Sequence, residues 1–125
     1  MKPSGYETRP DYRVDLHRRR NRVRARLGGR ILADSRRTLL LDEQNHGLVF
    51  YFAREDVDMA ALTAVADMTS HCPYKGDANY WTAQVEPGQL IAWSYETPYP
   101  QVAALTGYVA FYQDRVEVTL GTAEP

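Results

Sequence analysis

The chain of 125 residues contains one cysteine, Cys72, and no long apolar run. A single cysteine excludes an internal disulfide and any zinc site built from several cysteines. The longest apolar run spans residues 48–53, far short of the ~20 residues that a membrane-spanning helix needs. Residues 1–30 lack the apolar stretch of a signal peptide, so we expect a cytoplasmic protein without a membrane segment.

Recognisable catalytic motifs are also absent. Only three histidines are present, and no Gly-x-Ser-x-Gly turn accompanies them. No glycine-rich loop of the kind that cradles phosphate occurs either. The composition, with 44% apolar and 25% charged residues, is typical of one folded domain. The sequence therefore predicts a fold and a pocket, but it names no cofactor and leaves open whether the protein is an enzyme.

The net charge of −1 hides an uneven distribution along the chain. Residues 1–37 hold twelve of the fifteen lysines and arginines but only four of the sixteen acids. The net charge is therefore +8 in this segment and −9 in the remainder of the chain. Such asymmetry indicates contact with nucleic acid or another anion, with residues 18–26 as the interface. The alternative is an arginine-rich edge beside an acidic surface of the same fold, or of a second copy in a homodimer.

Apolar and polar residues alternate through most of the chain, which predicts a mainly β domain over residues 14–120. Residues 1–13 are expected to form a flexible arm and residues 121–125 a tail. The first predicted hairpin has a three-residue loop at 28–30, which pairs Leu27 with Ile31 and Ala25 with Ala33. Further strands are expected from Thr38 to Asp42 and over residues 48–53.

The second half of the chain predicts one more hairpin and some helical turns. Residues 54–66 have helical spacing and predict a turn or two of helix, whereas residues 69–77 predict a loop. A hairpin over 80–85 and 90–95, closed by Pro87-Gly88, would place Tyr80 opposite Tyr95. One of its faces would carry Trp81, Ala83, Val85, Leu90 and Ala92, and the other Tyr80, Thr82, Gln84, Ile91, Trp93 and Tyr95. A helical turn over 101–105 and a strand over 108–120, bent near 113–114, complete the chain.

The densest group of reactive side chains lies in the predicted loop at residues 71–76. Cys72 would become a nucleophile if His71 or Lys75 lowered the pKa of its thiol from the ordinary ~8.5. The alternative is an inert, buried Cys72 with both cations pointing elsewhere, because neighbouring residues of an extended chain point in opposite directions.

Charged residues directly follow the apolar run at 48–53. Arg54 there could pair with a carboxylate or phosphate at the mouth of a pocket. Glu55 and Asp56 are typical of the first turn of a helix. Asp56 and Asp58 resemble a magnesium pair only weakly, so we expect no metal.

Nine tyrosines and two tryptophans supply candidate pocket walls, since a buried tyrosine needs a partner for its hydroxyl. The candidates are Tyr80, Trp93, Tyr95, Tyr108 and Tyr112. Aromatic packing across strands explains the same residues equally well.

Five sequence blocks carry a family resemblance. They are Ile31-Leu32-Ala33-Asp34-Ser35-x-Arg37, Tyr51-Phe52-x-Arg54-Glu55-Asp56-Val57, Cys72-Pro73-Tyr74-Lys75-Gly76 with Tyr80-Trp81, Ala92-Trp93-x-Tyr95, and Gly107-Tyr108-Val109-Ala110-Phe111-Tyr112 with Asp114-Arg115-Val116. In this order they resemble the bacterial and fungal family called domain of unknown function 427, over roughly residues 22–118. The chain has Ala53 where that family commonly has proline, and Asp58 where it commonly has arginine.

The resemblance implies a compact, mainly β, two-sheet fold like that of the β-tent proteins, with a cleft between the sheets and one or two short helical turns. Some β-tent proteins hold zinc with four cysteines, a role that one cysteine cannot fill. The family is sometimes labelled nucleotidyltransferase-like, but the glycines and acids of this chain do not stand where that chemistry needs them.

Together these patterns predict an uncharacterised small-molecule-binding domain with an aromatic, anion-binding pocket. The expected catalytic residues are Cys72 and Lys75. The expected ligand-binding residues are Arg54, His71, Tyr80, Trp93, Tyr95 and Tyr112. The alternative function is a nucleic-acid-binding module that uses the arginine-rich segment.

Overall fold

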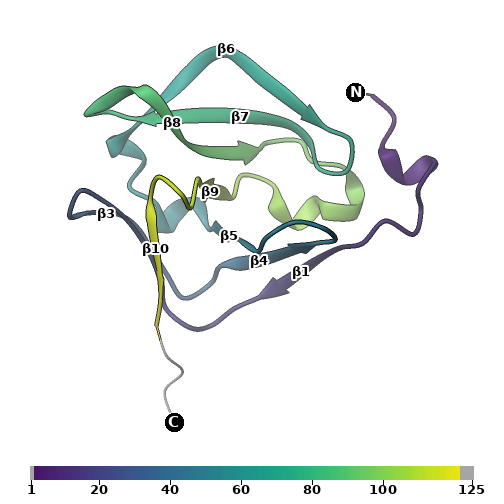
Figure 1. The fold of residues 1–125 in the computed structure, drawn as a ribbon, viewed down its shortest axis with the longest axis horizontal. Coiled ribbons are helices and arrows are strands. Elements are labelled where there is room, and N and C mark those ends of the chain that lie inside the picture. Colours follow the sequence, from purple (N-terminus) through teal and green to yellow (C-terminus); the bar gives the residue numbers. More distant parts are fainter. Residues whose placement is uncertain (1, 122–125) are drawn as a thin grey trace.

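The chain folds into two antiparallel β-sheets, with short 3-10 turns before the first strand and between strands of the larger sheet (Figure 1). The structure, a computed structural model, describes residues 2–121. In chain order the elements are η1 (Gly5–Glu7), β1 (Val14–Arg18), β2 (Val23–Leu27), β3 (Arg30–Ser35), β4 (Leu39–Glu43), β5 (Val49–Phe52), η2 (Arg54–Asp56), η3 (Met59–Ala61), β6 (Leu62–Cys72), β7 (Gly76–Ala83), β8 (Glu86–Tyr95), η4 (Pro100–Leu105), β9 (Val109–Phe111) and β10 (Glu117–Leu120). The expected mainly β, two-sheet domain is confirmed. Within the described residues, no helix is long and apolar enough to span a membrane.

The larger sheet has seven strands in the order β1-β4-β5-β9-β8-β7-β6. In Figure 1, β6, β7 and β8 run along the top of the molecule and β1 and β4 along the bottom, with β5 and β9 between them. All three residues of β9 are buried, and β5 buries Tyr51 and Phe52 on opposite faces. A strand covered on both faces reads as a continuous apolar run, which explains the sequences of these two strands.

Two hydrophobic cores lie on the two faces of this sheet. The first core packs it against the three-stranded sheet β10-β2-β3 and contains Val23, Ala25, Phe52, Trp81 and Phe111. The second core lies on the other face beneath η4 and contains Leu39, Leu41, Tyr51, Tyr95, Val102 and Leu105. The predicted helical turn near residues 101–105 is η4, whose buried Val102 and Leu105 cover this second core.

The β2–β3 hairpin differs from its predicted register only near the turn. The observed pairs are Val23 with Ser35, Arg24 with Asp34, Ala25 with Ala33, Arg26 with Ile31 and Leu27 with Arg30. The loop thus has two residues, Gly28 and Gly29, with the positive φ angles of 56° and 83° that a type I′ turn requires. A bulge at Leu32 absorbs one residue and restores the expected pairing beyond it. The three-residue loop was therefore wrong. The inward positions of the hairpin are confirmed beyond the bulge, but Ile31, expected to face inward, is 43% exposed, and Leu32 is buried in its place.

The predicted helix over residues 54–66 and loop over 69–77 are largely replaced by strands. The helical character is confined to η2 and η3, and β6 begins at residue 62. β6 and β7 pair up to Cys72 and Gly76, so the predicted loop shrinks to a tight turn. The pairing is interrupted between Ala64 and Thr69, where Asp67 adopts a φ of 58°. Local alanine spacing favoured helix, but pairing with β7 decided the structure.

The β7–β8 hairpin turns at Gln84 and Val85, so the predicted turn at Pro87-Gly88 was wrong: both residues lie within β8, and the pairing of the aromatic residues is offset by two. Tyr80 lies opposite Trp93 instead of Tyr95, because irregularities near the turn take up extra residues of β8. A shift of two keeps every side chain on its face. The expected aromatic face is therefore retained, except that Ile91, at a bulge, packs in the first core. On the other face, Val85 was expected in the core but is 76% exposed.

The predicted strand over 108–120 is two strands in different sheets. β9 belongs to the seven-stranded sheet and β10 pairs with β2 in the smaller one. The chain turns between them near the predicted bend, where the Arg115 N–H donates to the Tyr112 carbonyl. The prediction of a single strand over residues 108–120 was therefore wrong, whereas the predicted position of the bend is confirmed.

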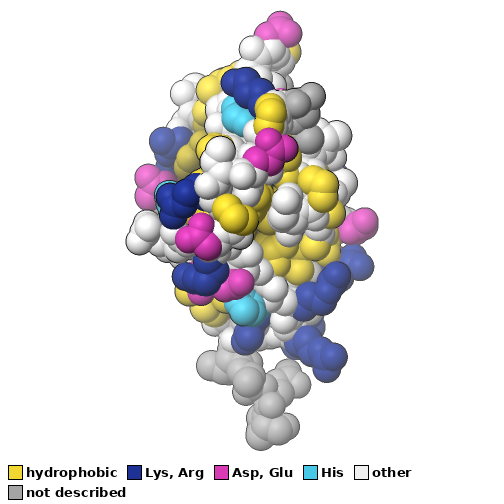
Figure 2. All heavy atoms as spheres, turned by 90° about the vertical axis from the view of Figure 1, so that its right-hand side faces the viewer, with side chains coloured by type: hydrophobic (Ala, Val, Ile, Leu, Met, Phe, Trp, Pro, Cys, Tyr) yellow, Lys and Arg dark blue, Asp and Glu magenta, His cyan; other side chains and the backbone are white. Residues whose placement is uncertain are grey.

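The segment before β1 lies against the β6–β7 turn. The ring of Tyr12 stacks on that of Tyr74, with centroids 3.6 Å apart and planes 9° apart. The Gly5 N–H donates to the Pro73 carbonyl over 2.7 Å. Figure 2 shows this side of the molecule, where hydrophobic side chains gather in the centre among charges of both signs.

The domain limits 14–120 stay a prediction. The predicted tail, except for Gly121, lies outside the described residues.

Candidate functional site

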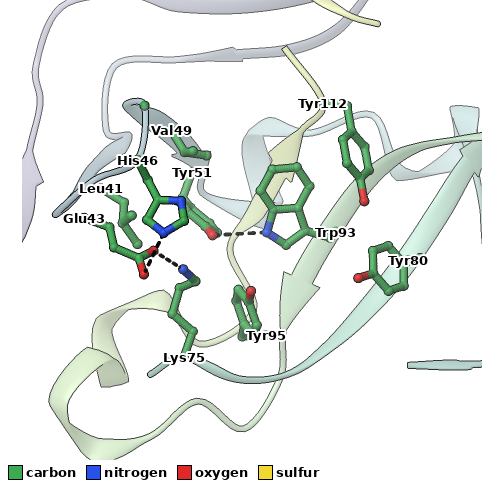
Figure 3. Close-up of a pocket in the computed structure, with 11 residues that line it drawn as sticks. Leu41, Glu43, His46, Val49, Tyr51, Lys75, Tyr80, Trp93, Tyr95 and Tyr112 are labelled. Carbon is green, nitrogen blue, oxygen red and sulfur yellow. Dashed lines mark hydrogen bonds and ion pairs between the residues drawn. The ribbon is translucent and has the colours of Figure 1, made fainter. Parts of the chain in front are cut away.

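A pocket of about 200 Å³ opens on the face of the seven-stranded sheet that carries the second core. It is lined from β4, β5 and their connection by Leu41, Glu43, His46, Gly47, Val49 and Tyr51, and from the opposite side by Lys75, Tyr80, Trp93, Tyr95 and Tyr112 (Figure 3). Strands on the two sides of β9 therefore meet at one cavity.

Aromatic rings form one wall of the pocket. The ring of Trp93 lies 4.8 Å from that of Tyr112 and, edge to face, 6.2 Å from that of Tyr51. The indole Nε1–H of Trp93 donates to the Tyr51 hydroxyl over 3.1 Å. Tyr80 is held on the same side through a hydrogen bond between its hydroxyl and Ser70. These contacts fix several ring planes toward one space, as Figure 3 shows.

Glu43 and Lys75 form the polar end of the pocket. The Lys75 ammonium donates to Oε1 of Glu43, and the Tyr12 hydroxyl donates to Oε2. Nε2 of His46 lies 3.7 Å from the same Oε2. Both oxygens of this nearly buried carboxylate are therefore engaged by protein donors.

The pKa of Glu43 is lowered in this environment. Burial raises it by disfavouring the charged form, but the hydrogen bonds from Lys75 and Tyr12 outweigh burial and hold the carboxyl ionised. Burial also raises the pKa of the Tyr51 and Tyr95 hydroxyls well above the ordinary value of 10. Both tyrosines thus stay protonated at neutral pH, so each hydroxyl keeps an O–H group that it can donate.

Strand periodicity explains how Glu43 reaches the pocket. Along β4, Leu39, Leu41 and Glu43 are the buried positions, and the residues between them are partly exposed. A period of two places these three on one face. Glu43, Tyr51 and His46 were not predicted to lie at the site, although an acid in phase with two leucines is a signal that could have identified Glu43.

The structure brings together five of the residues expected at the site: Lys75, Tyr80, Trp93, Tyr95 and Tyr112. Tyr108, another wall candidate, packs partly buried against the second core without lining the pocket.

Arg54 lies away from the pocket. Its guanidinium donates to Glu96 over 2.5 Å and to the Gly107 carbonyl over 3.0 Å, and it lies 5.3 Å from the ring centroid of Trp81. Trp81 belongs to the first core, on the face of the sheet opposite the pocket. Arg54 therefore ties the β8–η4 connection to η2.

His71 and Cys72 also lie outside the lining. Nδ1 of His71 lies 2.7 Å from Oδ1 of Asp77, and its Nε2 lies 3.3 Å from the Tyr99 hydroxyl. Cys72 packs partly buried against the second core. Within the described residues, no side chain forms a hydrogen bond with the Cys72 thiol.

The acids of the Asp56–Asp58 motif are engaged by separate partners. Asp56 accepts hydrogen bonds from Ser35 over 2.7 Å and from Arg37 over 2.9 Å, which outweigh its burial and lower its pKa. Asp58 accepts one from Arg30 over 2.9 Å. Both carboxylates are thus occupied by protein donors.

One cluster of metal-binding side-chain types lies elsewhere, in β1 and β4. Ligand atoms of Asp15, His17 and Asp42 lie within 4.8 Å of one another. The guanidinium of Arg13 pairs with both carboxylates, at 2.8 Å and 3.4 Å. The cluster therefore already contains a cation.

The sequence comparisons agree with the motifs. No curated protein is similar enough to count as a match. The family model described as Domain of unknown function (DUF427) matches residues 15–122, nearly the whole described chain. The chain therefore belongs to the DUF427 family.

Proposed function

We propose that the protein binds a small molecule that carries a planar ring and, at one end, hydrogen-bond acceptors such as those of a carboxylate. The observation that carries the proposal is that the rings of Tyr80, Trp93 and Tyr112 line the same pocket as Lys75. Ligand pockets commonly combine apolar walls with a few convergent polar groups.

The polar groups of the pocket offer donors and little acceptor capacity. The Lys75 ammonium has three N–H groups, and Glu43 takes one. Tyr51 accepts from Trp93, but its own O–H finds no acceptor among the described residues, and neither does that of Tyr95. Glu43, the one carboxylate of the lining, already accepts at both oxygens. A ligand bound there would therefore present acceptors.

Charge narrows the class of ligand further. Lys75 is already neutralised by Glu43, and Arg54, the other cation expected to bind an anion, pairs with Glu96 outside the pocket. A multiply charged phosphate would meet little compensating charge. A carboxylate or a ring carbonyl needs less compensating positive charge, because hydrogen bonds from neutral hydroxyls can replace much of the hydration that it loses on binding.

Tryptophan fluorescence and thermal shift test the proposal. The panel would contain aromatic carboxylates, the amines of the same rings, and aliphatic carboxylates. A Trp81→Phe variant leaves Trp93 as the sole indole, so any quenching reports on the pocket. We expect aromatic carboxylates to quench it and raise the melting temperature, and the other two groups to do neither.

A pair of tyrosine variants localises the binding. Tyr95→Phe removes one donor and should weaken affinity by about two- to tenfold, the value of a neutral hydrogen bond. Tyr108→Phe, which alters a second-core residue outside the lining, should leave affinity unchanged. Failure of every aromatic carboxylate to bind, or equal losses in the two variants, would overturn the proposal.

Lys75, expected to be catalytic, has a binding role in this proposal. Its ammonium pairs with Glu43, and its two remaining N–H groups suit a ligand acceptor. The catalytic role of Cys72, the cytoplasmic location and the homodimer stay predictions, of which light scattering at two salt concentrations tests the last.

A further inference from the structure

The outward face of the three-stranded sheet carries a row of arginines. In β2, Val23 and Ala25 are fully buried in the first core. Period-two alternation turns Arg24 and Arg26 to the opposite face, with Arg22 directly before the strand in the same phase. The central strand of the sheet therefore presents a line of guanidinium groups.

Acidic partners compensate this row only in part. Arg22 donates two hydrogen bonds to Asp34, over 2.8 Å and 2.6 Å, and Nε of Arg24 lies 3.4 Å from the same carboxylate. The pKa of Asp34 is lowered chiefly by the Arg22 hydrogen bond, with coulombic contributions from Arg24 and Arg36. One carboxylate thus faces several guanidinium groups.

Two donors in the row form no hydrogen bond within the described residues, although one of them, Nε of Arg24, lies near the Asp34 carboxylate. Nε of Arg24 and Nε of Arg26 are buried there without a hydrogen bond. Beside Arg24 lies a hollow of about 300 Å³, lined by Arg22, Arg24, Thr119, Leu120 and Gly121. A buried donor without a hydrogen bond is costly, so an anion in this hollow would relieve an unfavourable arrangement at Arg24.

Three exposed arginines extend the row toward β1. Arg18, Arg19 and Arg20 lie at the end of β1 and in the connection that leads to Arg22. The Gly121 N–H donates to the Arg22 carbonyl, which places this connection beside the hollow. Across residues 2–121, none of the three forms an ion pair with a carboxylate, and Nε of Arg19 donates to Asn21 over 3.3 Å. We name the set Arg18, Arg19, Arg20, Arg22, Arg24 and Arg26 the arginine row.

We propose that the arginine row binds the phosphate backbone of a nucleic acid duplex. Guanidinium groups bind phosphate through paired hydrogen bonds, and a line of them matches repeated phosphates better than a single small anion. The sheet has no aromatic residue in β2, β3 or β10, so it offers no platform on which unpaired bases could stack. Binding is therefore sequence-independent, and single strands gain nothing over duplexes. The inference is independent of the aromatic pocket.

Fluorescence anisotropy with a short labelled DNA duplex, and with one of its strands, tests this inference. If about four phosphates are neutralised, affinity for the duplex should fall about 100-fold between about 50 and 200 mM salt. The triple variant Arg20→Gln, Arg24→Gln, Arg26→Gln should weaken binding and flatten the salt slope by about one for each arginine that no longer neutralises a phosphate. A second variant, Arg18→Gln with Arg20→Gln, changes only exposed side chains and covers the case in which the triple variant fails to fold.

A charge-matched control separates this face from general attraction. Arg9, Arg13 and Arg37 are exposed, pair with carboxylates elsewhere, and lose the same charge when all three become glutamine. We expect this control to retain most of the affinity. Absence of duplex binding at low salt, equal losses in control and test variants, or tighter binding of the single strand would each overturn the proposal.

Discussion

Glu43 and Lys75 form an ion pair at the end of the aromatic pocket, with only 6% and 12% of their side chains exposed. The two residues are 32 positions apart in the chain, and β4 and the β6–β7 turn bring them together. Removing charged groups from water is costly, and their mutual attraction together with the Tyr12 hydrogen bond offsets that cost. The polar end of the pocket is consequently also part of what holds the fold together.

Lys75→Met should therefore destabilise the protein markedly. The substitution keeps the length of the side chain but leaves the Glu43 carboxylate buried without its ammonium. Breaking one side of such a pair costs about 3–5 kcal/mol. Urea unfolding at neutral pH measures the loss.

The double variant Glu43→Gln with Lys75→Met supplies the control. Because it removes both charges, it should be more stable than Lys75→Met alone. If the single and double variants lose the same stability, the ion pair is not the cause of the loss.

Stability should fall in mild acid, and Glu43 should contribute to that fall. The pKa of its carboxyl is lower in the folded protein than the ordinary 4.5 of an exposed chain. A lowered folded-state pKa adds stability above the unfolded pKa, and the contribution is lost as the pH falls through the folded-state value. The pKa values of Asp34 and Asp56 are lowered too, so their contributions change in the same direction.

Urea unfolding across the range from neutral to strongly acidic pH checks this dependence. Glu43→Gln should be less stable than the parent at neutral pH, because Lys75 loses its partner. The difference should start to narrow as the pH drops below about 4.5, where the carboxyl of the unfolded parent takes up a proton, and it should be lost as the pH falls through the lower folded-state pKa. A difference that stays constant with pH would show that ionisation of Glu43 does not contribute.

Away from the turns and bulges, the inward and outward faces of the hairpins were predictable from the sequence, whereas their registers were not. Side-chain alternation identified Ala25 and Ala33 as partners and grouped Tyr80, Trp93 and Tyr95 on one face. Bulges changed the pairing near both turns, and the alternation of side chains along a strand does not indicate where a bulge inserts an extra residue.

Half of the pocket was predictable for the same reason. The residues of β7 and β8 stood out as aromatic positions on one hairpin face, and Lys75 as a cation near them. The contributions of β4 and β5 depend on β5 pairing with β9, a contact between distant segments that local patterns do not encode. Arg54 illustrates the converse: its place after an apolar strand suggested a pocket mouth, but Glu96 and Gly107 hold it elsewhere.

Gly5→Ala should loosen the N-terminal segment. A Cβ at Gly5 would meet Cε1 of Tyr74 at 2.7 Å, closer than real Cβ atoms approach. Because Tyr74 stacks on Tyr12, the added methyl group should disturb the whole contact between this segment and the β6–β7 turn. Limited proteolysis should cleave the N-terminal segment faster in the variant.

Gly47→Ala is the matched control for this prediction. A Cβ at Gly47 would meet nothing within 4 Å, and its φ lies outside the positive range. The variant should be cleaved at the parental rate. Equal cleavage of parent and Gly5→Ala would mean that the contact with Tyr74 does not hold the segment in place.

Cys72 should react slowly with iodoacetamide while the protein is folded. Reactive thiols in proteins are activated by a neighbouring cation or helix terminus. The two cations nearest in sequence have other partners: Lys75 pairs with Glu43 and His71 with Asp77. Packing of Cys72 against the second core further limits access. Mass spectrometry should show that alkylation is much faster after denaturation. The Cys72→Ala variant should bind aromatic carboxylates as the parent does. Rapid alkylation of the native protein, together with loss of binding in Cys72→Ala, would instead support Cys72 as a nucleophile at the pocket.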